Sequence, residues 1–236
     1  MVRPLIFLAL LSAPLLAAPS PKAQPPRHPS AQTDWVHMVA PTAEGGVRMG
    51  NPSASLRIVE YGSRTCPHCA AFDAEGLANL KANYIATGRV SYEFRDFPVH
   101  GALDLAPILL GHCVQPSQFF SVLSQMYRDQ SELLSNADAT IAAVQSRHDA
   151  SPNQIATSYA EGLGYLSFMK QRGFSEPKLR SCLNDQKKIA SIANQAKFAD
   201  QTYKVGGTPT FILNGKTLVD VYDWSALEKV LSSARS

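Results

Sequence analysis

Residues 56–72 read LRIVEYGSRTCPHCAAF, and this stretch decides the fold. Residues 56–61 are mostly apolar and β-branched, which is the pattern of a buried strand. A turn over 62–65 follows, and apolar residues then recur at helical spacing from Cys66 onward. Residues 90–94 alternate apolar and polar side chains and predict a second strand. A strand, a helix and a strand within about 45 residues form a βαβ unit.

The rest of the chain extends this unit in both directions. Residues 35–39 and 46–49 predict two short strands separated by a turn. Over about 101–203, apolar residues recur at helical spacing and no strand pattern is found. A hairpin is predicted over 210–219, and Asp223 begins a final helix. We therefore expect an α/β fold with a large all-helical insertion after the second core strand.

The charge of the chain argues against one class of partner. The 236 residues include 22 Lys and Arg and 19 Asp and Glu, a formal charge of +3. Two of the basic residues, Arg3 and Lys22, lie in the first 23 residues, which contain no acid. The remaining chain is near neutral, so a nucleic-acid partner has no electrostatic support.

The first residues have the pattern of an export signal. Arg3 precedes an apolar run from Leu5 to Ala18, which is shorter than the roughly 20 residues that span a bilayer. We expect residues 1–23 to be a signal peptide, with a buried N-terminal helix as the alternative. Residues 24–34 are rich in Pro and predict an extended linker. Export would place the mature protein in the periplasm, an oxidising compartment.

The CPHC sequence holds two cysteines at the predicted start of a helix. Free N–H groups at a helix start and the helix dipole stabilise an anion, and the thiolate is the form that attacks disulfides. Pro67 suits the first turn because its missing N–H has no helical partner there, and His68 adds positive potential. We expect a strongly lowered pKa for Cys66, which makes its disulfide a strong oxidant. Cys66 is then the exposed, attacked sulfur and Cys69 the buried, resolving one.

Other roles for this cysteine pair remain open. A structural disulfide is one, and half of a zinc site is another, although no second close Cys or His pair accompanies it. Haem attachment requires His directly after the second cysteine, where Ala70 stands. We expect no metal and no cofactor beyond a redox-active Cys66–Cys69 disulfide.

Two motifs together resemble a known family. CPHC, followed about 140 residues later by the GGTPT sequence of 206–210, resembles the DsbA-like thiol:disulfide oxidoreductases of the thioredoxin superfamily. The resemblance covers about 35–235 and implies a thioredoxin fold with a helical insertion. It implies that Pro209 is cis and packs beside Cys66, and that Thr208 presents its backbone to substrate. The residues alone leave a trans bond open.

Thr208 departs from the family pattern in one respect. DsbA has valine at this position, whereas threonine is found in several isomerases and in many diverged family members. This difference bears on redox poise and on the choice of partner.

The residue patterns and the resemblance together divide the chain into five segments. They are a signal peptide (1–23), a linker (24–34), a first thioredoxin-fold part with CPHC (35–100), a helical insertion (101–203) and a second thioredoxin-fold part (204–236).

Glu60 lies in an otherwise apolar strand, six residues before Cys66. Burying an acid costs free energy unless the group has a partner or a role. In the resembled family an acid lies beneath the cysteine pair, where it would accept or relay a proton for Cys69. A solvent-facing position at the end of the strand is the alternative.

Cys113 and Cys182 both fall in the helical insertion. In an oxidising compartment we expect them to pair as a structural disulfide. Closing a loop of about 70 residues stabilises a fold by roughly 4 kcal/mol. A second redox relay and two separate buried thiols are the alternatives.

The sequence therefore predicts an exported enzyme that introduces disulfides into secreted or periplasmic proteins by dithiol–disulfide exchange. The resemblance implies unfolded exported proteins as substrates and a quinone-linked membrane protein similar to DsbB as re-oxidant. We expect a monomer. One alternative is an isomerase or reductase, which Thr208 favours, although 24–50 is too short for the dimerisation domain of such isomerases. A non-catalytic, chaperone-like binding module with a structural disulfide is the other.

Overall fold

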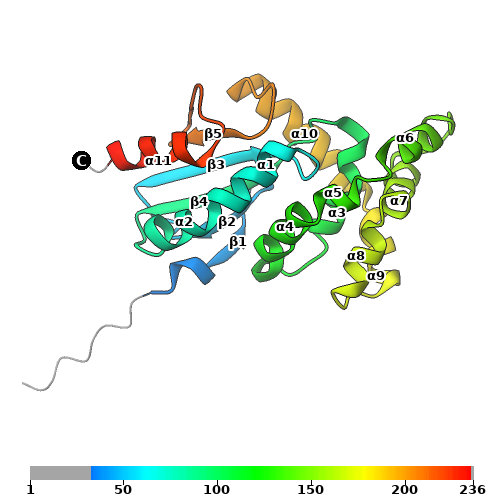
Figure 1. Cartoon of the computed structure of the whole chain (residues 1–236), viewed down its shortest axis with the longest axis horizontal. Helices are drawn as coiled ribbons and strands as arrows, with labels where there is room; N and C mark the ends of the chain where they lie inside the picture. Colours follow the sequence, from blue (N-terminus) through cyan, green and yellow to red (C-terminus); the bar gives the residue numbers. More distant parts are fainter. Residues whose placement is uncertain (1–32, 235–236) are drawn as a thin grey trace, which may run out of the picture. The chain divides into compact units, whose positions relative to one another are not determined.

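A six-stranded mixed sheet forms the centre of the fold (Figure 1). The computed structural model describes residues 33–234, so the predicted signal peptide and most of the predicted linker lie outside the described residues. The strands run in the order β1-β2-β4-β3-β5-β6. Their bounds are Val39–Pro41 (β1), Val47–Gly50 (β2), Leu56–Gly62 (β3), Val90–Asp96 (β4), Thr210–Leu213 (β5) and Lys216–Thr217 (β6).

The two central strands are parallel, as the βαβ pattern predicts. β3 and β4 pair in register from Leu56 opposite Val90 to Gly62 opposite Asp96. The other neighbouring strands are antiparallel. The carboxyl ends of β3 and β4 therefore meet at one edge of the sheet, and the CPHC sequence follows β3 directly.

The crossover from β3 to β4 is helical without interruption over 67–85. It consists of α1 (Pro67–Phe72), a π-helical turn η2 (Asp73–Leu77), α2 (Ala78–Leu80) and a second π-helical turn η3 (Lys81–Ile85). The final helix, α11 (Trp224–Ser233), packs beside it. A Cβ atom on Gly76 would lie 2.8 Å from Cβ of Trp224, so glycine is required where these helices approach.

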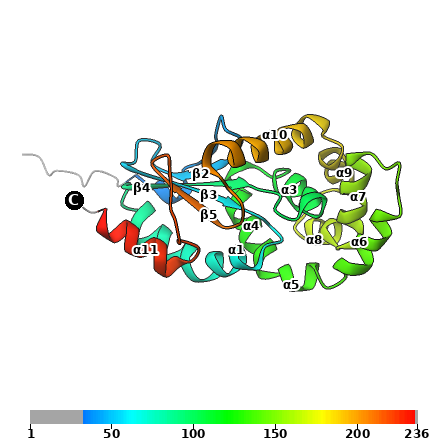
Figure 2. The same ribbon diagram turned by 90° about the horizontal axis from the view of Figure 1, so that it is seen from above.

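Helices cover both faces of the sheet (Figure 2). On one face Ile58, Phe94 and Phe211 form a core with Leu227 of α11. On the opposite face Tyr61 and Ile212 pack with Ala199 of α10 (Gln186–Tyr203). Side chains of β3 therefore point alternately into two separate layers.

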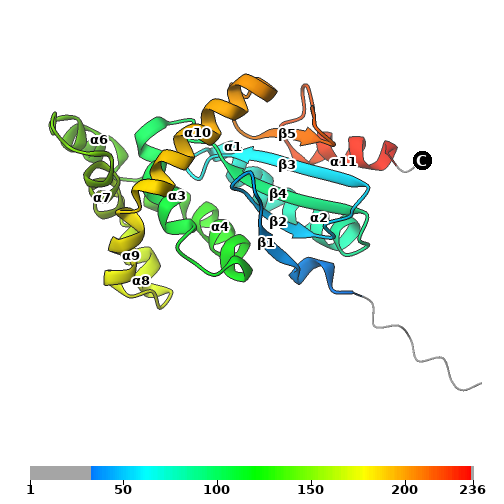
Figure 3. The same cartoon turned by 180° about the vertical axis from the view of Figure 1, so that it is seen from behind.

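The segment between β4 and β5 is entirely helical, and this confirms the predicted α/β fold with an all-helical insertion. Most of these helices lie beyond one end of the sheet (Figure 3). They precede α10 in the order η4 (Gly101–Asp104), α3 (Leu105–Gly111), η5 (Pro116–Gln118), α4 (Phe119–Arg128), α5 (Gln130–Leu133), α6 (Ala137–Gln145), α7 (Pro152–Gly162), α8 (Tyr165–Gln171) and α9 (Glu176–Leu183).

The insertion has its own core, and two helices connect this core to the sheet. In α4, Val122 and Met126 enter the insertion core while Phe120 and Leu123 enter the core beside the sheet. α10 packs against the insertion through its first half and against the sheet through its second. The five predicted segment boundaries stay predictions.

The first predicted strand is partly wrong. Trp35–His37 forms a 3-10 turn (η1), and β1 begins two residues later at Val39. A backbone hydrogen bond from Met38 to the Trp35 carbonyl closes the turn, and the Asp34 carboxylate lies 2.7 Å from the His37 ring. These local contacts outweigh the strand propensity of Trp and Val. Within 33–234, the helices are too short or too polar to span a membrane.

Candidate active site

The cysteine pair lies where β3 gives way to α1. Cys66 is the residue before the helix, with an extended backbone at φ −83° and ψ 122°, and Pro67 and His68 form its exposed first turn. Cys69 lies one turn further on and is 0% exposed. Cys66 is only 5% exposed, so it is far less open than the sequence predicts. Both cysteines are free thiols in this structure.

The two thiols differ strongly in acidity. A hydrogen bond from the Cys69 thiol and the backbone N–H groups of Cys69 and His68 lower the pKa of Cys66 to about 5, although burial acts in the opposite direction. Burial raises the pKa of Cys69 well above its usual value, and the hydrogen bond to Cys66 adds to this effect. At neutral pH the pair therefore holds one thiolate, on Cys66, and one thiol. His68 acts here through its backbone N–H.

The loop before β5 approaches Cys66 from the other side. The peptide bond between Thr208 and Pro209 is cis. Sγ of the protonated Cys66 donates a hydrogen bond of 3.2 Å to the Thr208 carbonyl. The Thr208 hydroxyl is buried and has no hydrogen-bond partner within the described part of the chain. A thiolate on Cys66 would give this hydroxyl an acceptor.

Glu60 is buried and does not face solvent. It is 1% exposed, and its carboxyl accepts a hydrogen bond of 2.6 Å from the Tyr92 hydroxyl. Burial raises the pKa of Glu60 to about 8. The negative form of Glu60 in turn contributes to the raised pKa of Cys69. An acid that titrates near neutral pH can exchange a proton with a nearby thiol.

Residues of the helical insertion hold the loop before Cys66. Nε2 of Gln130 donates to the carbonyls of Arg64 and Cys66 at 3.0 and 3.1 Å. The buried carboxylate of Asp104 accepts from the Ser63 and Thr65 hydroxyls at 2.8 and 2.9 Å. Local sequence patterns do not single out these groups, because they are far from the loop along the chain.

A buried ion pair also anchors this loop. Nε of Arg64 lies 2.6 Å from Asp96, and Nε2 of His112 lies 2.8 Å from the other oxygen of that carboxylate. Burial alone would raise the pKa of Asp96, but Arg64 and His112 outweigh it and hold that pKa well below its usual range. One sequence signal could have found Asp96: it lies at the carboxyl end of the strand beside β3.

Cys113 and Cys182 are joined by a disulfide, 69 residues apart in the sequence. The bond connects the end of α3 to α9, within the insertion. It therefore belongs to the packing of the insertion helices, while Cys66 and Cys69 remain free.

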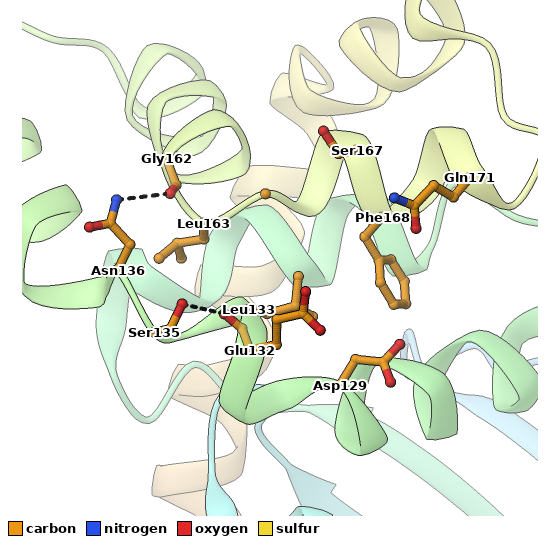
Figure 4. Close-up of a pocket in the computed structure, with 11 residues that line it drawn as sticks. Asp129, Glu132, Leu133, Ser135, Asn136, Gly162, Leu163, Ser167, Phe168 and Gln171 are labelled. Carbon is orange, nitrogen blue, oxygen red and sulfur yellow. Dashed lines mark hydrogen bonds between the residues drawn. The ribbon is translucent and has the colours of Figure 1, made fainter.

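One groove lies beside the helix that carries Cys69, and a separate cavity lies in the insertion. A groove of about 1100 Å³ runs between the α1–α2 segment and α4, and Ala70, Asp73 and Tyr127 are among its lining residues. A cavity of about 340 Å³ lies within the insertion between α5, α7 and α8 (Figure 4). In residues 33–234, no group of three or more His, Cys, Asp or Glu is arranged to hold a metal ion.

A strand-to-helix C-x-x-C pair beside a cis-proline loop defines a site of the DsbA-like thiol:disulfide oxidoreductase class. The family model of thioredoxin matches residues 42–233, and the chain belongs to this family. The predicted family and the predicted thioredoxin fold are therefore confirmed.

Individual relatives agree with this assignment. A Rickettsia conorii protein, provisionally named a protein-disulfide oxidoreductase, is 26% identical over 83% of this chain, and the chain spans 62% of that relative. The crystal structure of a protein-disulfide isomerase from Novosphingobium aromaticivorans gives a TM-score of 0.74 at 28% identity and covers 80% of this chain and 97% of its own. Wolbachia pipientis alpha-DsbA1 has the same fold, with a TM-score of 0.59 at 21% identity, covering 79% of this chain and 88% of its own.

Proposed function

We propose that this chain is an exported enzyme that introduces disulfides into secreted or periplasmic proteins. The observation that carries the proposal is the difference between the two thiols. Cys66 has a pKa of about 5, while burial raises the pKa of Cys69 well above its usual value. A stabilised thiolate favours the reduced pair, so the Cys66–Cys69 disulfide readily accepts electrons from a substrate.

The reaction proceeds in two exchanges. A substrate thiolate attacks Sγ of Cys66, a substrate–Cys66 bond forms, and the Cys66–Cys69 bond breaks with its electron pair passing to Cys69. The second substrate thiolate then attacks the substrate sulfur of the mixed disulfide. The substrate disulfide forms and Cys66 leaves as a thiolate. Its low pKa makes Cys66 a good leaving group.

Glu60 supplies the proton that Cys69 requires. When the first exchange places an electron pair on Cys69, a buried thiolate is unfavourable because desolvation opposes it. Glu60 has a pKa of about 8 and is protonated at neutral pH, so it can protonate Cys69. The Thr208 carbonyl, 3.2 Å from Sγ of Cys66, would meanwhile face the backbone of a bound substrate.

The cellular setting belongs to the same proposal. The pattern over 1–23 supports export to the periplasm. Substrates are then unfolded exported proteins with reduced cysteines, and a quinone-linked membrane protein similar to DsbB restores the disulfide. We propose a monomer as the working form.

A disulfide isomerase is the second candidate. Thr208 favours it, and the structure with a TM-score of 0.74 is named a protein-disulfide isomerase. An isomerase works with its pair reduced, whereas an oxidase works with its pair oxidised. The equilibrium between the two forms therefore separates the candidates.

A redox titration of the Cys66–Cys69 pair against glutathione mixtures tests the proposal, with the Cys113–Cys182 bond left intact. A reduction potential above about −150 mV supports the oxidase. A potential below about −230 mV identifies a reductant, in which electrons flow from the cysteine pair to the substrate. Cys66→Ser is the control and abolishes exchange. A wild-type chain that exchanges no disulfide overturns the enzyme assignment and leaves a non-catalytic binding module.

A further inference from the structure

A chain of hydrogen bonds leads outward from the residue that precedes Cys66. Thr65 is buried, and its hydroxyl lies 2.9 Å from Oδ1 of Asp104 and 2.7 Å from Nδ1 of His100. The backbone N–H of His100 donates to the other oxygen of Asp104 at 2.9 Å. The three residues thus form an Asp–Thr–His series attached to the reactive loop.

The hydrogen atoms in this series determine the state of the imidazole. The Asp104 carboxylate only accepts, and its contacts with the Ser63 and Thr65 hydroxyls use the single hydrogen of each. Thr65 has no second hydrogen to donate, so Nδ1–H of His100 is the donor in the 2.7 Å contact. The neutral ring therefore carries its hydrogen on Nδ1 and a free lone pair on Nε2.

The free nitrogen faces open surroundings. His100 is exposed, and Nε2 has no hydrogen-bond partner among residues 33–234. The unpaired nitrogen therefore belongs to an exposed side chain, on a ring hydrogen-bonded to the residue before Cys66.

We propose that His100 is the general base that takes the proton from an incoming substrate thiol, with Thr65 and Asp104 as positioning residues. The inference rests on the proposed function. Nε2 removes the S–H proton, and the resulting thiolate attacks Sγ of Cys66. A substrate–Cys66 bond forms while the Cys66–Cys69 bond breaks. The electron pair passes to Cys69, which is protonated from Glu60, and the imidazolium returns its proton to solvent.

The acidity of the substrate thiol limits how much a general base can accelerate the reaction. An ordinary cysteine has a pKa of about 8.5, so roughly 3% of it is thiolate at pH 7. A base that delivers the thiolate at the site can accelerate attack by at most about 30-fold at pH 7. Above pH 9 the substrate is already ionised and the gain disappears.

One acidic residue belongs to this hydrogen-bonded series. Asp104 of η4 is the acid in contact with His100, through its backbone and through Thr65. Burial raises the pKa of Asp104, and its hydrogen bonds from the His100 backbone, Ser63 and Thr65 oppose this shift. Next to Thr65 in the sequence, Arg64 carries a buried charge that is paired with Asp96, and Cys66 is the reactive thiol.

Two substitutions of His100 distinguish a role as general base from a purely structural role. In His100→Asn the amide nitrogen occupies the place of Nδ1 and keeps the bond to Thr65, but Nε2 is lost. In His100→Ala both are lost. The full chain, oxidised at Cys66–Cys69, is mixed with a reduced two-cysteine peptide, and single-turnover rates are measured from pH 6 to pH 9.5.

We expect His100→Asn and His100→Ala to lose about tenfold in rate at pH 7 and to match the wild type above pH 9. Thr65→Val should lose part of the rate, and Thr65→Ser should restore it. His148→Asn, at an exposed histidine between α6 and α7, is the matched control and stays unchanged. If His100→Asn reacts at the wild-type rate, or if its loss of rate is the same at every pH, the role of His100 as general base is overturned. If the wild type transfers no disulfide, the proposed function fails instead.

Discussion

The hydroxyl of Tyr92 lies 2.6 Å from Oε2 of Glu60, and both side chains are buried. They come from neighbouring parallel strands, β4 and β3, and point to the same face of the sheet. The hydrogen bond stabilises the ionised form of Glu60 and so opposes the effect of burial on its pKa. Tyr92 therefore adjusts the acidity of the group that we propose protonates Cys69.

Removing this hydroxyl should make Glu60 a weaker acid. In Tyr92→Phe the carboxylate loses its donor while the ring remains, so the pKa of Glu60 should rise further above about 8. Carboxyl ¹³C chemical shifts recorded against pH measure the change directly. Tyr84→Phe is the control, because its hydroxyl contacts Ser232 and not Glu60. An unchanged Glu60 titration in Tyr92→Phe would contradict the role given to Tyr92.

Glu60 should make the folded protein less stable as the pH rises. Its pKa is raised from 4.5 to about 8, so the folded state binds the proton more tightly than the unfolded state. Stability is therefore lost progressively between pH 4.5 and 8, by at most about 5 kcal/mol. Glu60→Gln removes this dependence. Urea unfolding at pH 4.5 and pH 8 measures the free energy of unfolding of both proteins. Relative to the wild type, the variant should be more stable at pH 8 than it is at pH 4.5. An equal difference between the two proteins at both pH values would refute the raised pKa of Glu60.

Cys69 should control the acidity of Cys66. The hydrogen bond from Cys69 is the main cause of the lowered pKa of Cys66, so Cys69→Ala should raise that pKa from about 5. Cys69→Ser keeps a hydroxyl donor and should stay closer to the wild type. Thiolate absorbance at 240 nm, followed against pH, gives both values. Equal pKa values for Cys66 in the two variants would assign the effect to the backbone N–H groups instead.

The second disulfide should stabilise the fold without entering the reaction. Changing both Cys113 and Cys182 to alanine removes a crosslink that closes a 69-residue separation. We expect a loss of about 2–5 kcal/mol in the free energy of unfolding, measured in guanidinium chloride. Exchange at Cys66 with glutathione should remain as in the wild type. A changed Cys66–Cys69 potential would show that the bond also acts on the redox pair.

Local patterns in the sequence predicted the βαβ unit, the helical insertion and the final hairpin, because strand and helix periodicities are properties of short segments. They also singled out Cys66, Cys69 and Glu60 as site residues. The partners of the reactive loop could not be found in this way. Gln130 and Asp104 reach it from helices of the insertion, and only the packed structure determines which polar side chains of such a segment face inward.

The exposure expected for Cys66 was wrong for a related reason. A position before a helix start suggests an open residue, but the Thr208 loop covers the sulfur from the side of β5. That cover depends on the pairing of β5 with β3, in which Tyr61 lies opposite Thr210. Pairing between strands so distant in sequence cannot be read from either strand alone.

The long helix α10 affects how the molecule unfolds. Its 18 residues extend over about 27 Å, and Ile192 and Ala199 anchor it in two different cores. Unfolding of the insertion would expose the face of the sheet that α10 covers. Unfolding of the sheet would in turn release the end of the insertion. The two halves should therefore unfold in a single cooperative transition. A protease that cuts between α6 and α7 would then act on the globally unfolded chain or on that loop alone, and would not find an intermediate with one half intact.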